Sequence, residues 1–190
     1  MSTQEEVNWE EVESAGRARP IGIVILSWLH LLGGMLLLGI LVMPLFMETD
    51  IDIVNASKEI GFPPAFLVLG VVMLTALNLG AGAGMMLEKT WGWYFAVYYY
   101  IHSIYRSGYA FYMVSQLADQ FEPGERSADY YYAKYGGRTV IHFLIFLYFF
   151  SEKVTDYFDI GKFNRAKVLG GLIMIYLGQI ALTTLIAMIF

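Results

Sequence analysis

The chain of 190 residues contains no cysteine. Disulfides, thiolate metal sites, iron–sulfur clusters and cysteine-based catalysis are therefore excluded. Charged residues are also scarce, at 15% of the sequence. No stretch of the kind that grips phosphate backbones, rich in Lys and Arg, occurs anywhere, so the sequence predicts no nucleic acid binding.

Apolar sequence, by contrast, is in excess. Hydrophobic residues make up 57% of the chain, above the roughly 45–50% of globular proteins. They are gathered in long runs that a water-soluble fold could not bury but that a bilayer solvates. We therefore predict an all-α, polytopic transmembrane helical bundle (20–190) behind an acidic N-terminal tail (1–19). That tail accounts for much of the net charge of −5.

The bundle is predicted to have about five spans, four forming a core and the fifth an added C-terminal helix. Their predicted limits are 20–46, 65–87, 91–114, 138–157 and 168–190. The short link Glu88-Lys89-Thr90 makes the second and third spans an antiparallel hairpin.

The fourth span is the least apolar of the five. A loop over 115–137 precedes it, with Gly136-Gly137 as a turn signal at its end. Only 139–150 is cleanly apolar, and the continuation 151–158 is interpreted as an amphipathic helical end. Packing of this piece against a neighbouring helix and a tilted re-entrant geometry are the alternatives.

Orientation follows from the placement of Lys and Arg, which gather on the cytoplasmic side of membrane proteins. With a cytoplasmic N-terminus, the basic residues inside are Arg17, Arg19, Lys89, Lys153, Lys162, Arg165 and Lys167. Those outside are Lys58, Arg126, Lys134 and Arg138. The first group is larger and closer to the span ends, so we predict a cytoplasmic N-terminus and an external C-terminus.

Each predicted span carries one strong hydrogen-bonding side chain near its middle. These residues are His30, Asn78, His102, His142 and Gln179. At ~1.5 Å rise per residue, all five lie roughly 13–18 Å deep. In one interpretation they join helices through interhelical hydrogen bonds. In the other, two or three histidines converge on a haem b or a metal ion, for which imidazole is a common ligand.

The third span has a stripe of tyrosine and histidine along one helical face, at intervals of three or four residues. Its members are Tyr94, Tyr98, His102, Tyr105, Tyr109 and Tyr112. Arg106 lies beside the stripe, and no carboxylate lies within the hydrocarbon stretch of any span to neutralise it. It either snorkels outward, pairs with backbone carbonyls or a loop acid such as Asp119, or binds an anion such as a lipid headgroup or haem propionate.

Catalytic and ion-coupling patterns are missing from the spans. Without a membrane-embedded Asp or Glu, proton or sodium coupling through a buried carboxylate is disfavoured. The sequence has no Ser-His-Asp order, no HExxH and no di-iron carboxylate set. The small-xxx-small pair Gly80-x-x-x-Gly84 indicates close helix packing. An enzyme is therefore the less favoured class.

Three short segments resemble parts of small uncharacterised prokaryotic four-helix membrane proteins of unknown function. They are Arg19-Pro20-Ile21-Gly22-Ile23 before an apolar helix, the hairpin turn 84–94 with Trp-Gly-Trp-Tyr, and the aromatic run 148–158. The resemblance covers about the first 160 residues. It implies a compact four-helix unit in a prokaryotic plasma membrane, with no assigned activity; the fifth helix departs from it.

Three functions remain open from the sequence. The leading hypothesis is a small non-catalytic accessory or scaffold subunit, partnered by the lipid bilayer and by other membrane subunits or a second copy. The first alternative is a membrane redox protein that binds haem or a metal ion through His30, His102 and His142, with Arg106 near the ligand. The second is a small channel or carrier lined by the tyrosine stripe.

Overall fold

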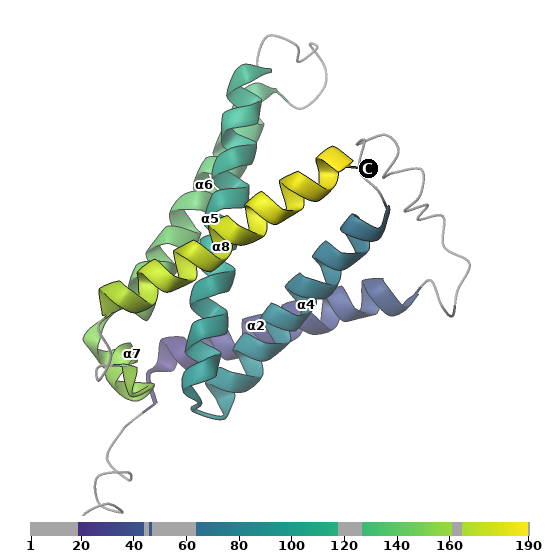
Figure 1. The fold of residues 1–190 in the computed structure, drawn as a ribbon. Coiled ribbons are helices and arrows are strands. Elements are labelled where there is room, and N and C mark those ends of the chain that lie inside the picture. Colours follow the sequence, from purple (N-terminus) through teal and green to yellow (C-terminus); the bar gives the residue numbers. More distant parts are fainter. Residues whose placement is uncertain (1–18, 44–45, 47–63, 118–126, 161–164, 190) are drawn as a thin grey trace, which may run out of the picture.

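The computed structural model describes residues 19–43, 46, 64–117, 127–160 and 165–189, and all regular structure in these ranges is helical. The helices are α2 (Ile21–Val42), α4 (Pro64–Met86), α5 (Thr90–Gln116), α6 (Ala128–Phe149), α7 (Glu152–Tyr157) and α8 (Arg165–Ile189) (Figure 1). The predicted all-α class is confirmed. Apart from Arg19, the predicted acidic tail lies outside the described residues.

Three of the described helices are long and apolar enough to cross a membrane: α2, most of α4 and most of α8. The helices α5 and α6 are as long, but tyrosines and basic side chains such as Arg106 and Arg138 make them less apolar. The structure thus supports a membrane helical bundle, with three helices meeting the length and composition of a span.

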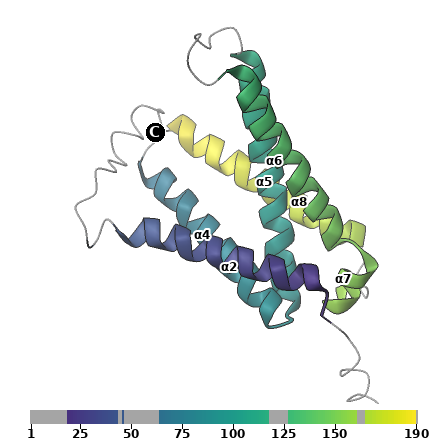
Figure 2. The same cartoon turned by 180° about the vertical axis from the view of Figure 1, so that it is seen from behind.

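The helices converge at one end of the molecule and diverge from it (Figures 1 and 2). The start of α2, the α4–α5 turn, the end of α6 and the start of α8 all lie near α7. From there α2 packs along α4, α4 leads into α5, and α5 packs along α6, while α8 has few contacts with α5. We call the converging end the α7 end.

The best-packed side chains are at the α7 end. Trp93 of α5 is fully buried beside Phe149 of α6 and Phe158, which follows α7. The Trp93 indole N–H donates to the Phe149 carbonyl at 2.9 Å, which satisfies a carbonyl at the end of α6. Dense packing of this kind holds helices together even where lipid removes the hydrophobic driving force.

The hairpin of α4 and α5 forms as predicted, and two glycines make it tight. A Cβ placed on Gly84 would lie 2.7 Å from the backbone nitrogen of Gly92, so no larger residue fits there without separating the helices. Glu88 closes α4 in the left-handed region, at φ 58°. The Lys89 N–H then donates to the Gly84 carbonyl at 2.9 Å, as in helix caps that usually use glycine.

The fourth helix begins earlier than predicted. α6 starts at Ala128, so the expectation of a loop through residue 137 is wrong for its last ten residues. Gly136 and Gly137, interpreted as a turn, lie inside the helix. Glycine costs only about 1 kcal/mol relative to alanine in a helix, which favourable packing outweighs. A site for Cβ on Gly136 would contact Phe111 of α5 at 3.4 Å.

The continuation after α6 packs down against its neighbours and does not emerge as a helical end. The chain turns at Phe150, Ser151 takes an extended conformation, and the short helix α7 follows. Val154, Thr155 and Ile160 are fully buried there. The charged residues Glu152, Lys153 and Asp156, which suggested an exposed helical end, are exposed, but Val154 and Thr155 between them are buried.

Candidate functional site

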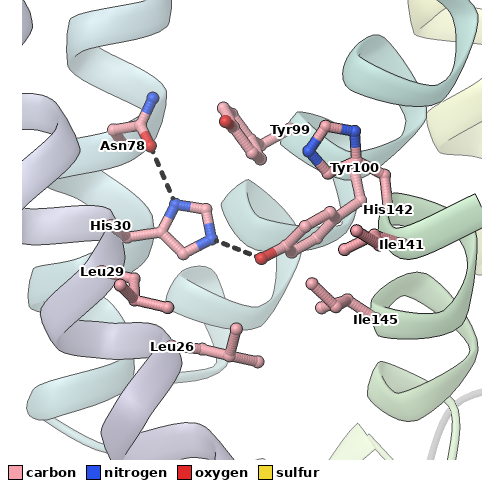
Figure 3. A pocket seen from close by; sticks show the side chains of 9 residues that line it. All are labelled: Leu26, Leu29, His30, Asn78, Tyr99, Tyr100, Ile141, His142 and Ile145. Carbon is pink, nitrogen blue, oxygen red and sulfur yellow. Dashed lines mark hydrogen bonds between the residues drawn. The ribbon is translucent and has the colours of Figure 1, made fainter. Parts of the chain in front are cut away.

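A chain of hydrogen bonds joins three helices inside the bundle (Figure 3). His30 of α2 bonds through Nδ1 to Oδ1 of Asn78 on α4, at 3.0 Å. Its Nε2 bonds to the hydroxyl of Tyr100 on α5, at 3.2 Å. All three side chains are buried, with exposed fractions of 3–5%.

The backbone around Asn78 sets the direction of these bonds. The Asn78 Nδ2 group donates to the Leu74 carbonyl at 2.8 Å, so Oδ1 is the atom that faces His30. An amide oxygen only accepts, so the His30 Nδ1 must carry a proton. In the neutral ring Nε2 then accepts the hydroxyl proton of Tyr100. The Tyr100 oxygen is left with acceptor capacity and no free proton.

A cavity of about 190 Å³ opens beside this chain, between α2, α4, α5 and α6 (Figure 3). Its walls combine apolar and polar side chains: Leu26, Leu29, His30, Asn78, Tyr99, Tyr100, Ile141, His142 and Ile145. Leu29 and Ile141 are 58% and 57% exposed, so they lie at its mouth. The cavity therefore opens sideways, between α2 and α6.

His142 of α6 also lines this cavity and has a ring nitrogen without a hydrogen-bond partner. Its Nδ1 is buried and has no hydrogen-bond partner. The ring centroid lies 6.0 Å from that of Tyr100, so the imidazole lies beside the phenol ring and away from its hydroxyl (Figure 3). A buried, unpaired ring nitrogen is costly unless something else satisfies it.

The third histidine lies against a different helix. The His102 ring contacts Tyr176 of α8 at a centroid distance of 5.7 Å, and its buried Nδ1 also has no partner. His102 is not part of the cavity wall that contains His30 and His142. Both ring nitrogens of His30 are already in hydrogen bonds. Among the described residues, no group of three or more His, Asp or Glu side chains could hold a metal ion.

The remaining midplane residue, Gln179, joins helices. Its Oε1 accepts a hydrogen bond from the Tyr98 hydroxyl of α5, and its Nε2 donates to the Met73 sulfur at 3.0 Å. Interhelical bonding thus accounts for Gln179 as it does for His30 and Asn78.

The tyrosine stripe of α5 is divided between contacts with α8 and the outer surface of the molecule. Tyr98 and Tyr105 contact Tyr176 of α8, while Tyr109 is 54% exposed. Arg106 is exposed beside them.

A second polar cluster ties the α7 end together. The Arg19 Nε donates to the Tyr157 hydroxyl at 2.8 Å. Its Nη2 donates to the Met86 carbonyl at 2.6 Å and pairs with the Glu88 carboxylate at 2.8 Å. The hydrogen bond to Tyr157 is the main cause that raises the pKa of Arg19. This cluster is structural, since it fastens the start of α2 to the end of α4 and to α7.

Sequence reasoning missed Tyr99 and Tyr100 as site residues. Tyr100 lies within the run Tyr98-Tyr99-Tyr100 and two positions before His102, so it shares the depth of the midplane layer. This shared depth could have indicated Tyr100 as a site residue. The tyrosine and histidine stripe instead favoured residues on the opposite side of the helix.

These features define a helical membrane bundle with a cavity that is lined by apolar and polar side chains and opens toward the side. No protein family, curated protein or solved structure matches the chain. The resemblance to small prokaryotic membrane proteins therefore stays a prediction.

Proposed function

We propose that this protein is a small non-catalytic membrane subunit that packs against a larger membrane assembly through α8. The bundle would cross a prokaryotic plasma membrane five times, through α2, α4, α5, α6 and α8, with its N-terminus in the cytoplasm. Support for this orientation comes from the basic residues Arg19, Lys89 and Lys153, which belong to segments at the α7 end.

The observation that carries the proposal is the incomplete packing of α8. Only 11% of its most apolar stretch is buried inside the molecule, against 28% for α2 and 39% for α4. Tyr176 and Gln179 fix one face of α8 to α5, and Met174, Ile175 and Leu177 on its other faces are more than half exposed. A helix attached along one narrow face leaves most of its surface for another helix.

Substitution of Gly178 tests this role without disturbing the monomer. Gly178 is exposed and a Cβ there would meet nothing within 4 Å, so we expect Gly178→Leu to keep the fold. Close helix packing in membranes depends on small residues, and a leucine there would push a partner helix away. The measurement is the mass and subunit stoichiometry of the complex extracted from its native membrane in mild detergent.

Gly39→Leu on α2 is the matched control, because a Cβ there also meets nothing within 4 Å. We expect stoichiometric partners with the unaltered protein and with Gly39→Leu, and their loss with Gly178→Leu. A monomer in all three preparations would contradict the proposal. Retention of the same partner by Gly178→Leu would show that α8 is not the docking helix.

A further inference from the structure

The cavity between α2, α4, α5 and α6 has the composition of a site for a small uncharged molecule. Ligand sites are concave and mainly apolar, with a few polar groups that fix orientation. Leu26, Ile141 and Ile145 supply the apolar wall here, and Tyr100 and His142 supply polar atoms. None of the residues that line it is Lys, Arg, Asp or Glu, so the wall offers no counter-charge to an ion.

The direction of the hydrogen-bond chain sets which polar group fits. Because Tyr100 gives its proton to His30, its oxygen can only accept from a further molecule. His142 also lines the cavity, but its Nδ1 is buried and so does not reach a molecule bound there. A hydroxyl is the group that suits the Tyr100 oxygen, because it donates to this oxygen as its acceptor.

The size and position of the cavity favour a ligand with one aromatic ring that is dissolved in the bilayer. A cavity of about 150 Å³ lined by apolar side chains is large enough for benzene. The cavity here measures about 190 Å³, which leaves room for a ring with a small substituent. Its mouth lies between the exposed side chains of Leu29 and Ile141, on the side of α2 and α6, where a bilayer supplies lipophilic molecules and water does not.

We propose that this cavity binds the hydroxyl-bearing ring of an uncharged lipophile, such as an alkylphenol or a hydroquinone, which enters from the bilayer between Leu29 and Ile141. The hydroxyl donates to the Tyr100 oxygen, and the alkyl chain leaves through the mouth into the lipid. This binding does not require the partner proposed for α8, so either idea can fail without the other.

Three probes of similar size test the chemistry: 4-octylphenol, 4-octylanisole and octylbenzene. Their dissociation constants are measured by calorimetric titration into the purified full chain at one fixed detergent concentration. A hydroxyl that donates to Tyr100 should make 4-octylphenol bind roughly twofold to tenfold tighter than 4-octylanisole, which has the oxygen but no proton. Equal affinity of all three probes would overturn the proposal.

Tyr100→Phe removes the proposed hydrogen-bond acceptor, the Tyr100 oxygen. Binding of octylbenzene by the same variant is the control for folding. The variant should bind octylbenzene as the unaltered protein does and lose the preference for 4-octylphenol. A preference that survives in Tyr100→Phe would show that the hydroxyl is recognised elsewhere, which also overturns the assignment.

The entry route is tested with a tryptophan at the mouth. Ile141→Trp should block the cavity and weaken 4-octylphenol binding at least tenfold. Val140→Trp is the matched control, because Val140 is 58% exposed on the same helix but does not line the cavity. Equal binding by the two variants would place the bound probe outside this cavity.

Discussion

In the cavity wall, the His30 Nδ1–H donates to the Asn78 Oδ1. One substitution, at Asn78, removes this acceptor. Asn78→Leu keeps a similar side-chain volume but leaves this donor unpaired in a buried position. We expect a loss of about 1–2 kcal/mol in the free energy of unfolding, because an unsatisfied buried donor keeps its full desolvation cost. The measurement is unfolding in mixed micelles of mild detergent and increasing SDS.

Thr75→Val is the control for this substitution. Thr75 is as buried as Asn78 on the same helix, but its hydroxyl bonds to the Val71 carbonyl of its own turn. That bond joins no helices, so its removal should cost less than about 1 kcal/mol. An equal loss from both variants would mean that the contact between His30 and Asn78 does not stabilise the bundle.

Residue by residue, the sequence predicted which side chains lie at one level along neighbouring helices better than it predicted the direction in which they point. Matching depth placed His30, Asn78 and His142 in one layer, and the structure brings these three to one cavity. Depth does not say which way a side chain points around its helix. His102 has the same depth and faces Tyr176 of α8, because the rotation of α5 depends on packing against all its neighbours.

Some glycines are required because two helices approach closely at them, and others could be replaced without a clash. A Cβ on Gly92 would lie 2.6 Å from the Gly84 Cα, so Gly92→Ala must push α4 and α5 apart at their turn. We expect a destabilisation of about 1–3 kcal/mol, the usual cost of overpacking. The change is read from the same SDS unfolding curves.

Gly137→Ala provides the opposite case. Its Cβ would meet nothing within 4 Å, and alanine is the better helix former. This variant should be unchanged or up to about 1 kcal/mol more stable. If both alanine variants shifted stability in the same direction, close approach of α4 and α5 could not be the reason for Gly92.

Predictability differed among the elements for a physical reason. The α4–α5 hairpin followed from a link too short for any other connection. The start of α6 and the separate α7 did not follow, because both depend on contacts with residues distant in sequence. Gly136 lies beside Phe111, and Tyr157 receives a hydrogen bond from Arg19.

The whole molecule combines a tight end with an open one. At the α7 end the helices share a dense aromatic core and the Arg19 cluster. Away from it the helices spread, which leaves space for the cavity and leaves α8 attached along one face (Figure 2).

The number of spans can be measured because the chain has no cysteine, so any introduced cysteine is the only thiol. Lys89 and Ser127 are exposed and lie at opposite ends of the stretch that contains α5. If α5 crosses the bilayer and the N-terminus is cytoplasmic, a membrane-impermeant maleimide labels Ser127→Cys on intact cells. Lys89→Cys should react only after the cells are permeabilised.

Two controls make the labelling pattern decisive. The unaltered protein measures background, and Ala96→Cys, at a fully buried position of α5, should stay unlabelled in both conditions. Labelling of Lys89→Cys and Ser127→Cys from the same side would mean that α5 does not cross, and only the more apolar helices would remain as spans. The reversed pattern would keep α5 as a span and place the N-terminus outside, against the distribution of basic residues.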